Sequence, residues 1–318
     1  MQDEDIGIAG FGAALPKTYL PLAELPLISP LENLEAFGFT GAAIAGDIGL
    51  LALRAAREAL INAALEPRDI DMLLWASARP AAHVRTSAAA TGGVLDEFCY
   101  SGSWLQEELG LDRAMVNGIA QQGCAGLFAA LRMARAVLVA EPEMNHVLCV
   151  GVDALPSGAC REVLYNVVSD AACAVVISRR AVRFRWRGFE QISKGYYWDV
   201  PARGSEIIAA YFPTAKAVIQ RVLNSTGLCP ADIDLVIPTG VNAASWPILL
   251  RLCGFPESAL YQPRQRFGHT IAADSFLLLQ QALLVGAIKP GMRLLLFTYG
   301  FGSSWCALVL ETTGEVKR

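Results

Sequence analysis

The chain has 318 residues, a formal net charge of −4, and a composition that is 54% hydrophobic and 18% charged. This length is enough for one large or two medium domains with a sizeable core, and the lack of a basic stripe in the sequence argues against a nucleic-acid partner. Charged residues interrupt every apolar run before the roughly 18 residues that a membrane span needs, so we expect the excess apolar surface to meet another subunit.

The cysteines and histidines indicate the redox environment and whether a metal site is to be expected. The eight cysteines form no CxxC pair and no regular framework, and the three histidines do not cluster. This pattern predicts a reducing, cytoplasmic environment and no metal site. The acidic N-terminal residues lead directly into a strand, so we expect no secretory signal.

Hydrophobic periodicity in the first part of the chain predicts, in order, a strand over 6–13, a Pro- and Leu-rich loop over 20–31, a helix over 47–64 and a strand over 72–76. A glycine-rich insertion over 89–104 precedes a short helix over 105–109. We interpret the insertion as a loop at a subunit contact or at the mouth of a pocket.

A repeat divides the chain into two halves. The segments 65–71 (LEPRDID) and 228–234 (LCPADID) share five of seven residues, and each follows a predicted helix, 47–64 or 215–223, and precedes a predicted strand. Apolar strands alternating with helices favour a sheet that is covered on both faces. The sequence therefore predicts two similar α/β halves, 1–180 and 181–318.

The segment 181–199 (AVRFRWRGFEQISKGYYWD) lies between these halves and is rich in aromatic residues and arginine. We expect an antiparallel hairpin with a solvated face here, although a functional surface also fits this composition.

The stretch 116–139 carries the best candidate for a nucleophile. An apolar run ends in Gln121-Gln122-Gly123, Cys124 follows, and an Ala/Leu-rich segment with helical periodicity begins at Ala125. The positive end of that helix favours a thiolate anion at Cys124. A buried cysteine that serves only as a small core residue is the alternative.

Several blocks along the chain resemble the thiolase superfamily, with the closest match to the β-ketoacyl-ACP synthase III branch. They are IGIAGFGAALP from Ile6, LLWASARPAAHVRTSAAA from Leu73, GIAQQGCAGLFAAL from Gly118, VLCVGVDAL from Val147, VSDAACAVVI from Val168, RFGHTIAADS from Arg266, and IKPGMRLLLFTYGFGSSWCALVL from Ile288. The resemblance implies a thiolase-like, five-layered αβαβα architecture of two duplicated α/β halves. It also implies that Cys124 carries an acyl group as a thioester.

The family's Cys-His-Asn triad is altered at two positions. In the segment PTGVN, Thr239 stands where the family has histidine, and in the segment HTIAAD, His269 stands where the family has asparagine. A threonine cannot supply the proton chemistry of an imidazole, so His269 remains as the candidate base for Cys124. A hydrogen-bonded histidine in an inactive site is the alternative. Asn242 and Asp274 belong to the same two segments, and we expect them to support or line the pocket with Thr239.

The resemblance further implies an oxyanion hole made by the backbone N–H groups of Cys124 and Phe301, next to Gly300. It implies acyl-CoA or an acyl carrier protein as the donor, a small-molecule acceptor with an oxygen, nitrogen or activated carbon nucleophile, a dimer, and no permanently bound cofactor. We expect an acyltransferase of specialised metabolite or polyketide biosynthesis. A carbon–carbon condensing enzyme, and an impaired subunit that supports a homologous partner in a heterodimer, are the alternatives.

Overall fold

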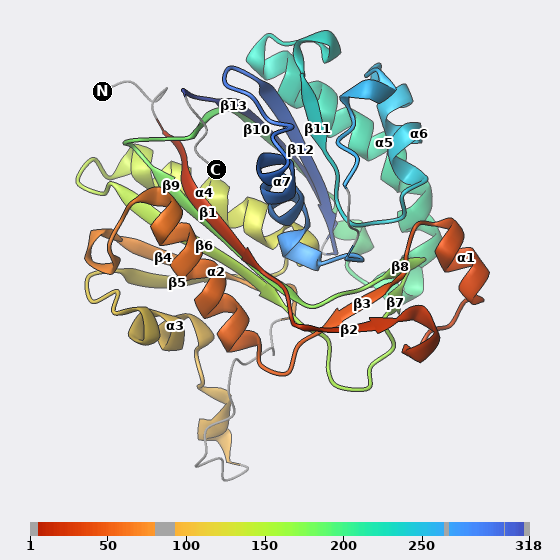
Figure 1. Cartoon of the computed structure of the whole chain (residues 1–318), viewed down its shortest axis with the longest axis horizontal. Helices are drawn as coiled ribbons and strands as arrows, with labels where there is room; N and C mark the ends of the chain where they lie inside the picture. The colour runs from red at the N-terminus through yellow and green to blue at the C-terminus, as the bar shows by residue number, and fades with distance from the viewer. Residues whose placement is uncertain (1–5, 80–92, 264–266, 302, 315–318) are drawn as a thin grey trace.

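A computed structural model describes residues 6–79, 93–263, 267–301 and 303–314 of the chain. Its main feature is a nine-stranded mixed sheet with the strand order β11-β12-β13-β10-β1-β9-β6-β4-β5 (Figure 1). The strands are β1 (Gly7–Ala14), β4 (Met72–Ala76), β5 (Met115–Ile119), β6 (His146–Asp153), β9 (Ala171–Ser178), β10 (Phe184–Ser193), β11 (Leu235–Ile237), β12 (Arg293–Gly300) and β13 (Ser304–Thr312). Two small two-stranded antiparallel sheets lie apart from it, β2 (Thr18–Pro21) with β3 (Gly41–Ile44), and β7 (Glu162–Val163) with β8 (Asn166–Val167).

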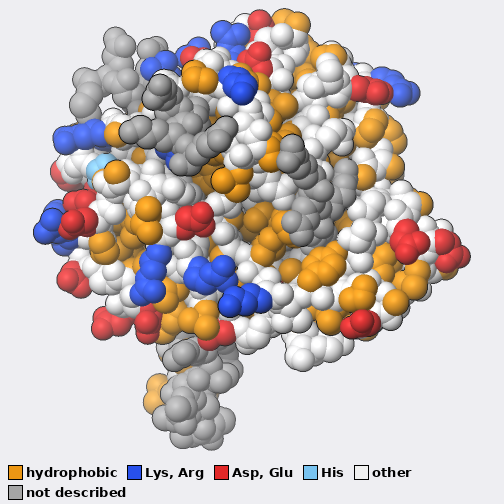
Figure 2. All heavy atoms as spheres, viewed as in Figure 1, with side chains coloured by type: hydrophobic (Ala, Val, Ile, Leu, Met, Phe, Trp, Pro, Cys, Tyr) orange, Lys and Arg blue, Asp and Glu red, His pale blue; other side chains and the backbone are white. Residues whose placement is uncertain are grey.

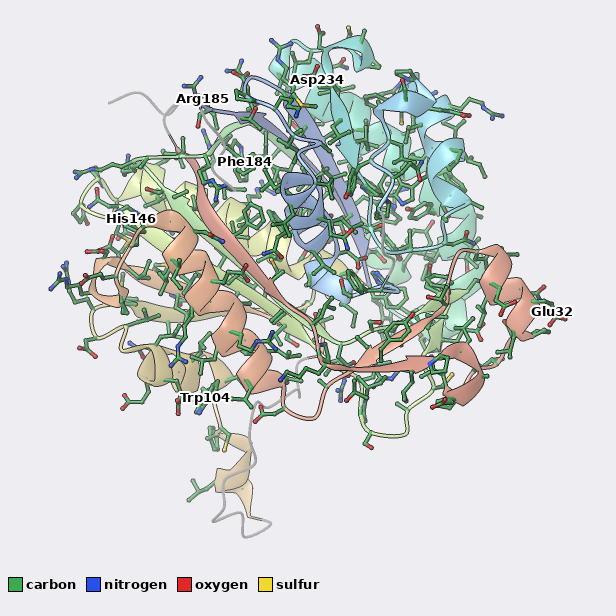
Figure 3. The ribbon with its side chains drawn as sticks, in the orientation of Figure 1. Glu32, Trp104, His146, Phe184, Arg185 and Asp234 are labelled. Atoms are coloured by element: carbon green, nitrogen blue, oxygen red, sulfur yellow. The ribbon has the colours of Figure 1, made fainter. Side chains whose placement is uncertain are left out.

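The nine-stranded sheet has two parts that meet along a short seam. We call β1, β9, β6, β4 and β5 the first sheet, and β10, β13, β12 and β11 the second sheet. β1 and β10 pair only at Gly7↔Arg185 and Ile8↔Phe184, whereas β10 pairs with β13 along its whole length. Gly7 permits this approach, because a Cβ there would lie 2.1 Å from the Phe184 carbonyl oxygen. Phe184 and Arg185 point to opposite sides of the strand (Figure 3), with Phe184 fully buried and Arg185 partly exposed.

Helices cover both sheets and separate them. The helices are α1 (Leu31–Ala36), α2 (Ile48–Ala63), α3 (Ser101–Leu109), α4 (Gly126–Ala140), α5 (Val200–Thr226), α6 (Ser245–Cys253) and α7 (Asp274–Leu284). One apolar cluster joins α2 and α3 to the first sheet, a second joins α4 and α7 to both sheets, and a third joins α5 and α6 to the second sheet. The resulting layer order is αβαβα, as expected from the sequence (Figure 1).

The sequence repeat has the same structure in both halves. Each copy forms a 3₁₀ turn, η3 (Pro67–Asp69) or η7 (Pro230–Asp232), before its strand. Asp71 accepts hydrogen bonds from the backbone N–H groups that begin β6, and Asp234 accepts one from the N–H of Arg293 at the start of β12. Each aspartate therefore ties together two neighbouring parallel strands. The division at residue 180/181 stays a prediction.

Three sequence-based expectations need correction. The segment 181–199 is not a hairpin, because most of it forms β10, which pairs with β13 and β1 inside the sheet. The helix predicted over 215–223 is the C-terminal part of α5, which continues through Pro213 and has a kink at Arg203. The stretch 20–31 is not a continuous loop, since β2 ends at Pro21 and a 3₁₀ turn, Leu22–Glu24, follows.

One helical stretch, Gly123–Ala140, is long and apolar enough by composition to cross a membrane. It contains Arg132 and Arg135, and half of it is buried inside the protein, where α4 lies between the two sheets. The face of the molecule seen in Figure 2 carries basic and acidic side chains interspersed among apolar ones.

Candidate active site

Cys124 lies in a sharp turn directly before α4. The 3₁₀ turn η5 (Gly123–Ala125) leads into the helix, and both Gln121 (φ 63°) and Gly123 (φ 51°) adopt left-handed backbone conformations. A Cβ at Gly123 would lie 2.4 Å from the backbone nitrogen of Phe301, so only glycine fits at this contact. The turn therefore presents Cys124, which is partly exposed, at the N-terminal end of α4.

His269 meets Cys124 from the other half of the chain. Its Nε2 lies 3.1 Å from Sγ of Cys124. The backbone of His269 is fixed by β8 and the residues after it, since its N–H donates to the Val167 carbonyl at 2.8 Å and its carbonyl accepts from the Ser169 N–H at 2.9 Å. Gly268 before it has φ +78°, which lets the chain turn into this contact. The imidazole is thereby held at the thiol.

Asp274 completes the arrangement behind the imidazole. Its Oδ2 lies 2.5 Å from Nδ1 of His269, and its Oδ1 accepts hydrogen bonds from the backbone N–H and the hydroxyl of Thr270. The turn η9 (Ile271–Ala273) places Asp274 at the first position of α7, and Ile271 has φ 56°, an unfavourable conformation for a β-branched residue. Cys124, His269 and Asp274 therefore form a continuous hydrogen-bonded triad.

The triad is electrostatically coupled. Burial lowers the pKa of His269, but the Asp274 carboxylate and the Cys124 thiolate raise it more, so that the pKa lies well above its ordinary value. His269 is 9% exposed and Asp274 is 2% exposed, so water screens these interactions weakly. The arrangement favours the charged imidazolium form of His269.

A second buried carboxyl group lies near the triad. Asp153, at the end of β6, accepts hydrogen bonds from the Ser77 hydroxyl and the Ala78 N–H, at 3.0 Å and 2.7 Å. Burial raises the pKa of Asp153 to about 7, against the lowering effect of these hydrogen bonds and of His269.

The end of β12 packs closely against the cysteine turn, where the N–H groups of Cys124 and Phe301 are expected to form an oxyanion hole. A Cβ on Gly300 would lie 1.9 Å from the carbonyl oxygen of Gln122 and 2.9 Å from the backbone nitrogen of Cys124. The end of β12 is thus in direct contact with the cysteine turn, and Phe301 is the next residue after Gly300. Gly302, which follows Phe301, lies outside the described residues.

A cavity of about 510 Å³ opens in front of the triad. Its lining is mainly apolar, with aromatic side chains from the turn between β7 and β8, from the end of β12 and the residue after it, from α5 and from the segment before α5. The aromatic residues are Tyr165, Trp198, Tyr211, Phe212, Tyr299 and Phe301. Three edge-on contacts link four of these rings in the order Phe212, Tyr211, Tyr299, Phe301, with centroid distances of 5.1, 5.9 and 6.1 Å. This volume and lining suit a small organic ligand.

Thr239 and Asn242 also line this cavity, together with Cys124 and His269. The Asn242 N–H donates to Oδ1 of Asn166, and its own Oδ1 accepts from the N–H of Ala244, so the loop is held in place.

The structure brings together all the residues singled out in the sequence that it describes. Cys124, His269, Thr239, Asn242 and Phe301 line one cavity, while Asp274 lies behind His269 and Gly300 under Cys124. The direct contact between Asp274 and His269 was not anticipated, although the two belong to one quoted segment. The contribution of α5 to the wall of this cavity was also not anticipated, because the predicted helix began after Pro213. His83 and Ser87, a family-like pair in the Leu73 block, lie outside the described residues.

Comparisons with known proteins agree with this fold. A family model described as 3-oxoacyl-[acyl-carrier-protein (ACP)] synthase III C terminal matches residues 223–312. The β-ketoacyl-[acyl-carrier-protein] synthase III of Aquifex aeolicus is 26% identical, over 96% of this chain and 98% of the relative. The structure of ChlB3, named as an acyltransferase, superposes with a TM-score of 0.81 at 22% identity and covers 97% of this chain and 98% of that one. The priming β-ketosynthase of the R1128 polyketide pathway superposes with a TM-score of 0.77 at 22% identity, covering 97% and 96%.

The fold and the motifs together define a thiolase-fold protein. Its C-terminal part matches the family model of β-ketoacyl-ACP synthase III, and along nearly its whole length the chain is similar to enzymes of that branch.

Proposed function

We propose that this chain is a thioester-dependent acyltransferase that works through a Cys124–His269–Asp274 triad. The observation that carries the proposal is the 3.1 Å contact between Sγ of Cys124 and Nε2 of His269, with Asp274 bound to the opposite ring nitrogen. A nucleophile, a base and a group that orients the base are the parts that acyl transfer requires.

In the loading step, His269 takes the proton of Cys124 and the thiolate attacks the carbonyl carbon of an acyl thioester. The negative oxygen that forms is held by the N–H groups of Cys124 and Phe301. The intermediate then collapses, the pantetheine thiolate leaves, and it takes the proton back from the His269 imidazolium. Cys124 is left as an acyl thioester and His269 is neutral.

In the transfer step, neutral His269 takes a proton from the acceptor, whose oxygen, nitrogen or activated carbon attacks the acyl-Cys124 carbonyl. Collapse of the second intermediate expels the Cys124 thiolate, which pairs again with the His269 imidazolium. Asp274 holds the ring so that Nε2 faces the reacting atoms in both steps. Both half-reactions use the same two side chains.

Acyl-CoA or an acyl carrier protein is the proposed donor. Pantetheine thioesters are the donors that the family resemblance implies, and the apolar cavity in front of Cys124 suits an acyl group. No permanently bound cofactor enters these steps. A role in specialised metabolite or polyketide biosynthesis is in keeping with two structural neighbours, one named as an acyltransferase and one as a polyketide priming enzyme. A cytoplasmic location remains part of the proposal.

The test is the intact mass of the protein after incubation with a panel of acyl-CoA and acyl-carrier thioesters. We expect a mass increase equal to the acyl group for the parent and none for Cys124→Ala. We expect Thr239→Ala to load as the parent does, because Thr239 takes no part in the proton transfers. His269→Ala should load slowly and then keep its acyl group when an acceptor is added.

The two other candidate functions give different results in this test. A condensing enzyme would release carbon dioxide and a β-keto product when a malonyl thioester is added. Thr239 in the pocket argues against this, because its hydroxyl is a neutral donor that cannot replace the charge and proton chemistry of the family's histidine beside an enolate. No adduct from any donor would overturn the acyltransferase proposal in favour of the impaired subunit, to be sought by co-purification with a homologous chain.

A homodimer completes the proposal. β5 lies at the edge of the sheet, and Met115 on it is 47% exposed. An edge strand with apolar side chains is suited to pair with a second copy. Sedimentation velocity should give about twice the mass of a 34.1 kDa chain, and Met115→Lys should shift the protein toward monomer.

A further inference from the structure

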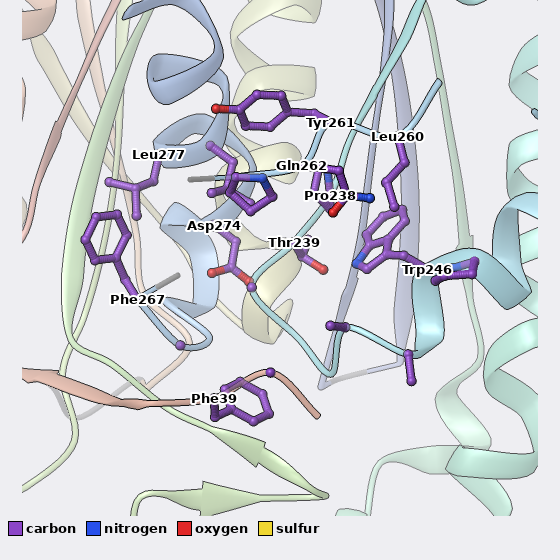
Figure 4. Close-up of a pocket in the computed structure, with 18 of the residues that line it drawn as sticks. Phe39, Pro238, Thr239, Trp246, Leu260, Tyr261, Gln262, Phe267, Asp274 and Leu277 are labelled. Carbon is purple, nitrogen blue, oxygen red and sulfur yellow. The ribbon is translucent and has the colours of Figure 1, made fainter. Parts of the chain in front are cut away.

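A second cavity, of about 330 Å³, lies beside the cavity that Cys124 and His269 line. Figure 4 shows it between the loop after β11, the N-terminal end of α6, α7 and the segment before β3. The residues that form its apolar wall are Phe39, Pro238, Trp246, Leu260, Phe267, Leu277 and Leu278. Nothing in the proposed loading or transfer steps uses this space.

Thr239 separates the two cavities, since it lines both. It is also the residue that replaces the larger histidine of the family. The loops that carry Thr239 and His269 touch here, because a Cβ on Gly240 would lie 2.2 Å from the carbonyl oxygen of Gly268 and 2.9 Å from Oδ1 of Asp274. A molecule in the second cavity therefore lies against Asp274, with Thr239 between it and the cavity that Cys124 and His269 line.

The charge of the wall restricts what can bind. Asp274 is the one charged residue among the described residues that line the cavity, and both of its oxygens are occupied by His269 and Thr270. With no described cation to pair with an anion, and with Asp274 already bound, the walls favour a neutral molecule. The mouth lies where Ala244 and Gln262 are exposed.

Trp246 supplies a polar group to this otherwise apolar wall. The residue is 3% exposed, and no residue in the described part of the chain accepts a hydrogen bond from its indole N–H. Figure 4 shows the indole nitrogen turned toward the Thr239 hydroxyl, across the cavity from Asp274. A buried donor of this kind is stabilised when a ligand brings an acceptor oxygen.

We propose that the second cavity is a binding site for a small neutral molecule that has an apolar body and one hydrogen-bond acceptor, a carbonyl or hydroxyl oxygen, placed between Thr239 and Trp246. The acyl acceptor itself is one source of such a molecule, and in that form the inference rests on the proposed acyl transfer. A separate effector molecule has the same chemistry and would bind in the same way.

The binding site is tested with acetophenone, a neutral ketone with an apolar ring, added to the full-length protein. The readout is the indole N–H NMR signal of Trp246, assigned by its loss in Trp246→Phe. We expect this signal to move downfield and saturate, and Trp246→Phe to bind acetophenone about 5- to 10-fold more weakly by competition or calorimetry. A Trp246 signal that does not move at saturating probe would overturn the proposal.

Two exposed alanines provide a matched pair of variants. Ala244→Phe places a ring in the mouth of the second cavity, whereas Ala231→Phe adds the same ring on η7, at a position that lines neither cavity. We expect Ala244→Phe to abolish the shift of the Trp246 signal and Ala231→Phe to leave it as in the parent. Equal binding by both variants would place acetophenone elsewhere and overturn the proposal.

The source of the ligand is tested with 2-phenylethanol, which adds a nucleophilic hydroxyl to a similar apolar body. If the cavity holds the acceptor, this alcohol shortens the lifetime of acyl-Cys124 in the parent and not in Ala244→Phe, as followed by intact mass. If it moves the Trp246 signal without discharging the acyl group, the cavity binds an effector. The NMR measurement does not depend on acylation of Cys124. A failure of the proposed acyl transfer can therefore be distinguished from a failure of the proposed binding site.

Discussion

Asp274 and His269 are joined by a 2.5 Å contact between Oδ2 and Nδ1, and this contact turns Nε2 of the imidazole toward the thiol of Cys124. The carboxylate fixes the tautomer of the imidazole and stabilises its charged form. Its own position depends on two hydrogen bonds from Thr270 and on its place at the start of α7. The effects of substitutions at the site follow from this pair.

Replacing Asp274 by asparagine should slow both acylation and discharge of Cys124. The variant keeps the shape of the side chain but loses the charge that favours the imidazolium, so we expect a fall of about 10²- to 10⁴-fold in rate. The measurement is the time course of acyl-enzyme mass with a donor that labels the parent. Thr270→Val is the control, because it removes one hydrogen bond to Asp274 and leaves the carboxylate. An unchanged rate in Asp274→Asn would mean that the contact is only structural.

The raised pKa of His269 predicts a dependence of stability on pH. Because the pKa in the folded protein lies above the unfolded value of about 6.5, the stabilisation is complete below that pH and is lost as the pH rises through the folded pKa. We expect the free energy of unfolding of the parent to fall with rising pH above about 6.5, and that of Cys124→Ala to fall less, because Cys124 contributes to the raised pKa of His269.

The same urea titrations on Cys124→Ala/Asp274→Asn provide the comparison. Without the carboxylate, burial alone acts on His269 and lowers its pKa. The decline above pH 6.5 should therefore disappear or reverse in the double variant. Parallel curves for the two proteins would contradict the assignment of the raised pKa to Asp274.

Much of this arrangement could be predicted from the sequence, and the rest depends on packing. Cys124 and His269 are 145 positions apart, yet each lies in a motif that identifies it. The two similar α/β halves followed from apolar strands and the 65–71 and 228–234 segments, whereas the five-layered architecture followed from the resemblance to the thiolase superfamily. These features are local in sequence, which is why they could be predicted.

The features that were missed depend on backbone conformations that the sequence does not reveal. Asp274 reaches back to His269 only because Ile271 takes a left-handed conformation, which is rare for isoleucine. The α5 wall was missed because proline usually ends a helix, whereas Pro213 lies inside α5. β10 resembled a solvated hairpin because buried Trp186 alternates with the partly exposed Arg185 and Arg187.

The close contact between Gly300 and the cysteine turn predicts a sharp cost for any side chain there. An added Cβ would lie 1.9 Å from the Gln122 carbonyl oxygen and 2.5 Å from the Ala125 nitrogen, both backbone atoms that cannot rotate away. We expect Gly300→Ala to lose about 1–3 kcal/mol of stability, by analogy with overpacked cores, and to lose acylation because the turn shifts. Gly46→Ala is the control, since nothing lies within 4 Å of a Cβ there. Equal urea midpoints and equal loading for the two variants would contradict this reading.

Removing one partner of the buried ion pair between Arg161 and Asp170 should be strongly destabilising. The two side chains are 4% and 0% exposed, and Asp170 also accepts hydrogen bonds from the N–H groups of Ala45 and Leu155. Replacing Arg161 by methionine leaves the buried carboxylate without its charged partner, so we expect a loss of about 3–5 kcal/mol in urea unfolding.

The exposed pair between Arg68 and Glu66 provides the matched control. Its atoms are 2.7 Å apart, but the side chains are 77% and 64% exposed, so water screens the charges. Arg68→Met should therefore cost less than about 1 kcal/mol. If the two substitutions destabilise the protein equally, burial does not set the strength of the Arg161–Asp170 pair. If Arg161→Met lowers stability without changing the rate of acylation of Cys124, the pair supports the fold and not the triad.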